Sequence, residues 1–327
     1  MSKLPIHQHY PDASQLVFGT MNLGGGWNNN PISKADLTQA HELLETCASL
    51  GINIIDLADI YTFGKAETVI GQVFRENKSL RNRFIVQSKV GIRLGPDVKV
   101  NHYDLSASWV TKAVYASLER LGLDGIDILF LHRSDPLMEI EPLCEALNNL
   151  HNQNKFSALA VSNMHAGQMA LIQTHIEMPL IANQLELSLA HSGFVEEGMT
   201  TNMDENASCG FPRGTLEFCQ QQGVQLQAWG ALAQGKYSSD SGTRGNTEQD
   251  SHVANTQSVI SRIAREYKVS SSAIVLAWLM RHPQNIQPVV GSTKASRIEE
   301  AHQALGVKLT REQWYEILQA RRGGEVP

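Results

Sequence analysis

The sequence predicts a single (β/α)8 barrel, the architecture also called a TIM barrel. Short runs rich in β-branched residues alternate with longer segments of helical period, and this alternation recurs eight times without a second compositional block. Strands separated by helices pair in parallel through right-handed crossovers, so eight such units favour a closed barrel. The alternative is an open, doubly wound sheet. Its fingerprint G-x-G-x-x-G is missing, because the glycines Gly19, Gly24, Gly25 and Gly26 have a different spacing.

The first half of the chain contains four strand-helix units. Its first strand, residues 16–18, ends at Gly19, and Ser33 is expected to cap the helix that follows. The other three strands are expected at residues 53–56, 84–89 and 126–132, with helices that begin near Ala66, Ser108 and Pro142.

The second half supplies the remaining four units. Its strands are expected at residues 156–162, 180–184, 224–229 and 286–290. A C-terminal helix begins near Thr310, because Thr310 and Gln313 fit a capping box. Residues 1–327 are therefore expected to form one domain, with an N-terminal tail over 1–14 and a C-terminal helix and tail over 308–327.

Two segments interrupt the regular alternation of strands and helices. Residues 188–214 contain several glycines, and residues 235–254 are rich in Ser, Asp, Gly and Asn. Both follow expected strands, and loops after strands open on the catalytic face of a barrel. Each segment is therefore a candidate lid or substrate wall, and the alternative is a surface insertion.

Composition and charge exclude several classes of protein. The chain has 27 Lys and Arg against 33 Asp and Glu, a net charge of −6, which argues against nucleic-acid and membrane-surface binding. Its four cysteines are scattered, with no C-x-x-C pair, as expected in a reducing compartment. The N-terminus lacks the apolar core of a signal peptide, and no 18-residue apolar run is present. These features predict a cytoplasmic protein without membrane spans.

Polar, titratable residues follow three consecutive strands. Asp56 ends the second expected strand, Lys89 the third and His132 the fourth, and Tyr61 lies in the loop after Asp56. Any one of them alone has a plain structural explanation. Burying all four at one mouth costs desolvation unless they interact, so together they indicate a reaction centre.

The segments that carry these residues resemble the signatures of the aldo-keto reductase family. The matching pieces, in order, are Ile55–Tyr61, Gln87–Lys89, Leu131–His132 and Val161–Asn163. The likeness extends from about residue 16 to about residue 320. It looks closest to the bacterial YdhF-type oxidoreductases, in which the segment seen here as His132–Met138 also appears.

The resemblance implies a catalytic tetrad of Asp56, Tyr61, Lys89 and His132. Reduction of a carbonyl by hydride needs a proton donor at the developing alkoxide, and Tyr61 is placed in that role. Lys89 is expected to lower the pKa of the Tyr61 phenol, while Asp56 pairs with Lys89 and holds it in place. His132 is expected to hydrogen-bond the carbonyl oxygen and orient it.

The resemblance also implies contacts to the nicotinamide of NADPH or NADP+. Ser162, Asn163 and Gln184 are similar to the residues that bind the carboxamide. Trp229 lies where the family stacks an aromatic ring, usually Tyr, on the nicotinamide. Thr20 and Met21 lie where the backbone contacts the ring.

The phosphate end of the cofactor is placed at the helix after the eighth strand. A helix N-terminus with small and hydroxyl residues suits an anion, and this position commonly holds phosphate in barrels. Arg297 resembles the residue that clamps the 2′-phosphate, which favours NADPH over NADH. The full set expected to bind the nucleotide comprises Leu232, Gly235, Lys236, Gly291, Ser292, Thr293, Lys294, Arg297 and Glu300.

The sequence departs from the family pattern at several positions. Asp-Thr-Ala becomes Asp56-Leu57-Ala58, and Tyr-Gly becomes Tyr61-Thr62. Gly291 stands where a small residue or Lys often begins the phosphate segment, and Ala301 stands where many members have an adenine-binding Asn. The first two changes leave the tetrad intact, whereas the last two weaken the adenine clamp.

The function implied is an NADPH-dependent reduction of aldehydes or ketones to alcohols, without a metal. A small carbonyl compound is the expected substrate; its identity, the physiological direction and the oligomeric state have no signal in the sequence. The alternative is an NADPH-binding regulatory or interaction protein with little turnover. A metal-dependent hydrolase is disfavoured, because the motif His7-Gln8-His9 precedes the first strand.

Overall fold

A computed structural model describes residues 3–95, 98–204, 209–238 and 248–327. Within these residues, eight parallel strands close into one barrel, in the order β1-β10-β9-β8-β7-β6-β3-β2. The barrel strands are β1 (Val17–Gly19), β2 (Ile54–Asp56), β3 (Ile85–Val90), β6 (Ile126–Leu131), β7 (Phe156–Ser162), β8 (Leu180–Glu186), β9 (Gln225–Trp229) and β10 (Gln287–Gly291). All eight predicted strands are confirmed to within two residues, and so is the single-domain (β/α)8 barrel.

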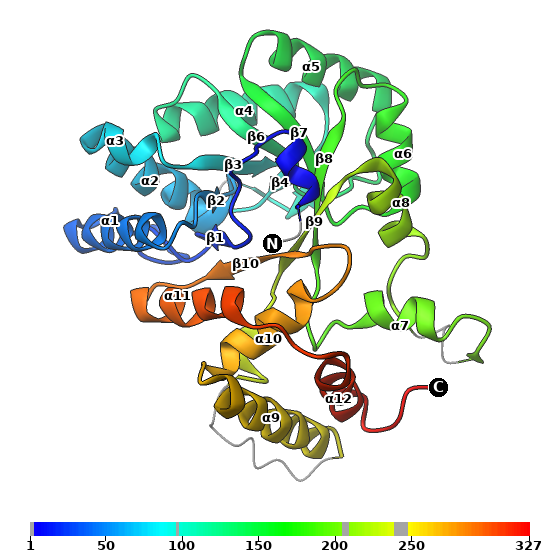
Figure 1. Cartoon of the computed structure of the whole chain (residues 1–327). Helices are drawn as coiled ribbons and strands as arrows, with labels where there is room; N and C mark the ends of the chain where they lie inside the picture. Colours follow the sequence, from blue (N-terminus) through cyan, green and yellow to red (C-terminus); the bar gives the residue numbers. More distant parts are fainter. Residues whose placement is uncertain (1–2, 96–97, 205–208, 239–247) are drawn as a thin grey trace.

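Helices surround the barrel, as Figure 1 shows. They are α1 (Lys34–Ser49), α2 (Lys65–Glu76), α3 (Lys78–Arg81), α4 (Ala107–Leu121), α5 (Ile140–Asn152), α6 (Ala166–Gln173), α7 (Gly193–Met199), α8 (Thr215–Gln222), α9 (Glu248–Tyr267), α10 (Ser271–Met280), α11 (Ala295–His302) and α12 (Arg311–Arg322). Ser33 caps α1 and Thr310 caps α12 with capping boxes, because both hydroxyls accept a backbone N–H of the first turn. A short antiparallel pair, β4 (Ile92–Arg93) and β5 (His102–Tyr103), follows β3.

The N-terminal segment, expected as a tail, closes the floor of the barrel. Its 3-10 turn η1 (Pro5–Gln8) buries Leu4 and Ile6 in a small apolar cluster with Val17, Ile128 and other inward-facing strand residues. Burial of apolar side chains against the strand N-termini excludes water from that end. The open end of the barrel is therefore the opposite one, where the strands have their C-termini.

The two irregular segments contain helices that the sequence analysis did not place. Residues 193–199 form α7, and α9 begins at residue 248, inside the expected loop 235–254. Arg321 of α12 donates to the carbonyl oxygens of Leu189 and Ala190 and pairs with Glu196 at 2.7 Å. The C-terminal helix thus anchors the first segment. Residues 205–208 and 239–247 of these segments lie outside the described part of the chain.

Candidate active site

Three strand ends bring the expected tetrad together at the open mouth. Lys89 Nζ lies 2.6 Å from Asp56 Oδ1, 3.1 Å from the Tyr61 hydroxyl oxygen and 3.0 Å from the Leu57 carbonyl oxygen. The Lys89 side chain is fully buried, and Asp56 is nearly so. A buried ammonium needs such partners, because an unpaired charge has a large desolvation penalty. The side chain of Lys89 is therefore fixed between the carboxylate and the phenol.

Burial controls the protonation of Tyr61. Desolvation raises the Tyr61 pKa to about 12, and Asp56 adds to this effect, while Lys89 opposes it. Lys89 thus lowers the Tyr61 pKa in the expected direction, but desolvation raises that pKa by more. Burial also tends to lower the Lys89 pKa, but Asp56 and Tyr61 together raise it above its ordinary value. At neutral pH the pair is a phenol and an ammonium.

His132 stands beside Tyr61 as a neutral imidazole. The two rings meet edge to face, with centroids 6.0 Å apart. Burial, followed by the charges of Lys89 and Arg133, holds the His132 pKa well below its ordinary value. The buried Nδ1 has no hydrogen-bond partner within the described residues. A neutral imidazole with free hydrogen-bonding capacity suits the orienting role predicted for it.

An amide network under Asp56 is a feature that the sequence analysis missed. Gln87 Nε2 and Gln184 Nε2 donate to Asp56 Oδ1 at 2.6 and 2.9 Å, and both also donate to Gln227 Oε1. Gln227 in turn donates to Gln287 Oε1 at 3.3 Å. The sequence contains a signal for this network, because these glutamines are inward-facing polar residues in buried strands. Only Gln87 and Gln184 contact Asp56, and these contacts depend on strand register across the barrel.

The residues expected at the nicotinamide form a connected group. Trp229 Nε1 donates to Asn163 Oδ1 at 3.0 Å, and Asn163 Nδ2 donates to Ser162 Oγ at 2.8 Å. Asn163 has a φ of +57°, a conformation that asparagine tolerates better than most residues. The side-chain nitrogen of Gln184 is engaged with Asp56, so its carbonyl oxygen Oε1 is the group left for a ligand. Thr20 is buried and donates through Oγ1 to the Asp56 carbonyl oxygen at 2.8 Å.

The expected nucleotide residues meet at a cleft of about 630 Å³ between the β1, β9 and β10 loops. Its wall includes Met21, Leu232, Gly235, Gly291, Ser292, Thr293, Arg297 and Glu300 from the expected set. Lys236 and Lys294 flank the wall without lining it. Within the described residues, the Arg297 guanidinium has no ion-pair or hydrogen-bond partner. A free guanidinium at the start of α11 suits a phosphate group.

Two departures from the family pattern acquire a structural explanation. Thr62 replaces a glycine and has a φ of +49°, which is unfavourable for a β-branched residue. Its hydroxyl donates to the Leu23 carbonyl oxygen at 2.7 Å, which offsets part of that cost. Ala301 is buried against the core, whereas Glu300 faces the cleft. The cleft therefore has the Glu300 carboxylate at the position next to Ala301.

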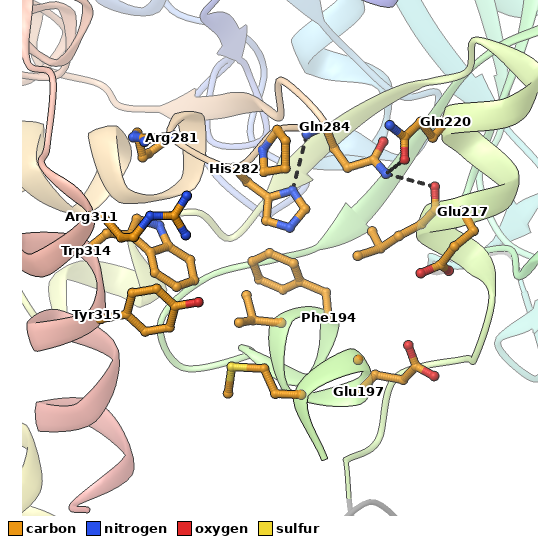
Figure 2. A pocket seen from close by; sticks show the side chains of 15 residues that line it. Phe194, Glu197, Glu217, Gln220, Arg281, His282, Gln284, Arg311, Trp314 and Tyr315 are labelled. Carbon is orange, nitrogen blue, oxygen red and sulfur yellow. Dashed lines mark hydrogen bonds between the residues drawn. The ribbon is translucent and has the colours of Figure 1, made fainter. Parts of the chain in front are cut away.

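A second hollow lies away from this mouth, on the outside of the barrel (Figure 2). It measures about 520 Å³, and its walls come from α7, α8, α12 and the turn between α10 and β10. Aromatic side chains, including Phe194, Trp314 and Tyr315, line one side of it. None of the expected site residues contributes to this hollow.

The comparisons with known proteins place the chain in a class and a family. It is an oxidoreductase of the (β/α)8-barrel class, and it belongs to the aldo/keto reductase family, whose sequence model matches residues 15–322. It is 32% identical to a 6-dehydroglucose reductase of Agrobacterium fabrum over 322 residues, 96% of each chain. It is 28% identical to oxidoreductase YdhF of Escherichia coli over 330 residues, 100% of each chain. The expected kinship with YdhF-type proteins is confirmed.

Solved structures share the fold. The glycerol dehydrogenase of Gluconobacter oxydans superposes with a TM-score of 0.77 at 22% identity and covers 94% of this chain and 91% of its own. An aldo-keto reductase of Klebsiella pneumoniae in complex with NADPH has a TM-score of 0.72 at 22% identity, covering 96% and 92%. Among the described residues, no helix has the length and apolar character needed to span a membrane. In the same residues, no group of three or more His, Cys, Asp or Glu could hold a metal ion.

Proposed function

We propose that this protein is an NADPH-dependent carbonyl reductase that converts aldehydes or ketones to alcohols, with Tyr61 as the general acid. The observation that carries the proposal is the contact of one buried ammonium, Lys89 Nζ, with both Asp56 Oδ1 and the Tyr61 hydroxyl. The free Arg297 at the cleft supports NADPH as the cofactor, and so does the NADPH complex of the similar Klebsiella protein.

Each residue of the mouth has a defined part in this reaction. Bound NADPH supplies the hydride. Tyr61, a phenol at neutral pH, donates its proton to the alkoxide oxygen as negative charge develops there. Lys89 stabilises the resulting phenolate, and Asp56 keeps Lys89 in position. The neutral imidazole of His132 offers an N–H to the carbonyl oxygen and orients it.

The proposal is tested by following NADPH absorbance with a panel of carbonyl compounds. The panel contains aromatic aldehydes, dicarbonyls, simple ketones and 6-dehydroglucose, the last because of the name of the Agrobacterium relative. Carbonyl-dependent consumption of NADPH is the expected result. Tight NADPH binding without consumption by any member of the panel would instead favour the regulatory, cofactor-binding protein.

The pH dependence should differ between the two directions of the reaction. The Tyr61 pKa is about 12 and that of His132 lies well below its ordinary value, so neither group changes its charge between pH 7 and 9. We expect kcat for reduction to vary by about twofold or less over this range. Oxidation of the product alcohol needs the Tyr61 phenolate, so its kcat should rise about tenfold per pH unit. A reduction rate that falls steeply above pH 8 would identify a different acid.

The substitution Arg297→Met tests the choice of NADPH. Loss of a charge-assisted pair with the 2′-phosphate should raise KM for NADPH by about 10- to 100-fold. KM for NADH, which lacks that phosphate, should change by about twofold or less. Steady-state kinetics with both cofactors give the answer, and an equal loss with both would mean that Arg297 does not read the 2′-phosphate.

A further inference from the structure

A separate pocket lies on the outer side of the loop that carries Tyr61. It measures about 400 Å³ and lies between that loop, β4 and α4. We call it the flank pocket and define it by Asp59, Phe63, Arg93, Trp109, Lys112 and Arg120, which are among its lining residues. It shares no residue with the wall of the nucleotide cleft.

Unpartnered polar atoms concentrate around the flank pocket. In the described part of the chain, six buried side-chain nitrogen and oxygen atoms have no hydrogen-bond partner. Three of them, Asp59 Oδ1, Arg93 Nε and Trp109 Nε1, belong to residues that line this pocket. The Asp59 Oδ1 atom is buried, although the residue as a whole is partly exposed. Buried polar groups are normally satisfied, so this concentration indicates hydrogen-bonding partners that the chain itself does not supply.

The charges of the flank pocket favour an anion. Arg93 pairs with Asp104 at 3.2 Å and Arg120 pairs with Glu67 at 2.7 Å. The Lys112 ammonium has no carboxylate partner within the described residues; it lies 5.7 Å from the centroid of the Trp109 ring. Burial, followed by the nearby Glu67, raises the Asp59 pKa well above its ordinary value. The raised pKa favours the protonated form of Asp59, in which the carboxyl is an O–H donor.

We propose that the flank pocket binds the anionic group, carboxylate or phosphate, of a small ligand. Lys112 supplies a positive charge. Arg93 supplies the planar guanidinium that such groups accept as a hydrogen-bond donor. In its protonated form, the Asp59 carboxyl adds an O–H donor next to them.

A ligand in this pocket would adjoin the catalytic loop. Asp59 precedes Tyr61 by two residues, and its backbone N–H donates to the Lys89 carbonyl oxygen at 3.0 Å. Phe63, which follows Tyr61 by two residues, also lines the pocket. The binding site itself does not depend on the proposed reaction, so it can be tested without any turnover.

Calorimetric titration with inorganic phosphate and with succinate tests the proposal. Saturating NADP+ is present throughout, so that the nucleotide cleft is already filled. We expect saturable binding of one or both probes, and the tighter probe identifies the headgroup. Lys112→Met should weaken binding by about tenfold or more, because it removes a charge-assisted contact. Arg93→Gln should weaken it in the same direction.

Lys155→Met is the matched control. Lys155 also lies on an aromatic ring, 5.6 Å from the Tyr115 centroid, but it does not line the flank pocket. Its substitution should leave probe binding unchanged within about twofold. The proposal is overturned if neither probe binds saturably to the wild-type protein. It is equally overturned if Lys112→Met and Lys155→Met bind the tighter probe alike.

Discussion

Tyr61→Phe should lower the rate of carbonyl reduction by about 10²- to 10⁴-fold, the usual contribution of a positioned general acid. The change removes one hydroxyl, 3.1 Å from Lys89 Nζ, and keeps the ring that packs against His132. Lys89 retains Asp56 and the Leu57 carbonyl oxygen as partners. NADPH binding, measured by fluorescence titration, should therefore change by about twofold or less, because none of the cofactor contacts is touched.

Tyr10→Phe provides the matched control for this experiment. The Tyr10 hydroxyl also donates a hydrogen bond, to the Asp127 carbonyl oxygen at 2.7 Å, but Tyr10 is a partly buried residue at the closed floor of the barrel. Its removal should leave turnover unchanged while costing about 1 kcal/mol of stability. Wild-type turnover in Tyr61→Phe would remove Tyr61 from the role of acid. Equal losses in both variants would point to general damage to the barrel.

The fold could be predicted from the sequence because the residue patterns that indicate it are local. The β-branched runs predict strands, and Ser33 and Thr310 cap helices through residues three positions away. The eight-fold recurrence then determines the closure. The conformation of the N-terminal segment was not accessible, since Leu4 and Ile6 are placed by contacts with strands far along the chain. Irregular composition likewise concealed α7.

The candidate site likewise has features that the sequence predicts and features that it does not. The positions of Asp56 and Lys89 at neighbouring strand ends, with Tyr61 in the loop after Asp56, follow from barrel geometry once the strands are known. Their electrostatics do not follow, because the Tyr61 pKa depends on how completely the phenol is desolvated. The link from Gln227 to Asp56 through Gln87 and Gln184 depends on side chains that meet across the interior. The spacing of these residues along the chain does not predict such side-chain contacts.

Lys89→Met should destabilise the protein by about 3–5 kcal/mol, because it leaves Asp56 as an unpaired charge in a nearly water-free site. The Lys89 side chain is 0% exposed and that of Asp56 is 3% exposed, so solvent screens the pair very little. The amide groups of Gln87 and Gln184 remain as hydrogen-bond donors to Asp56, but they carry no charge that balances it. Urea unfolding of the wild type and the variant measures the difference.

The double variant Asp56→Asn/Lys89→Met separates stability from catalysis. It removes both charges and keeps an amide oxygen that can accept from Gln87 and Gln184, so most of the lost stability should return. Reduction should remain impaired, because no ammonium then stabilises the phenolate of Tyr61. If the double variant were no more stable than Lys89→Met, the lost stability would come from packing. A return of activity with stability would show that the ion pair only supports the fold, whereas stability without activity requires that the Lys89 charge acts on Tyr61 itself.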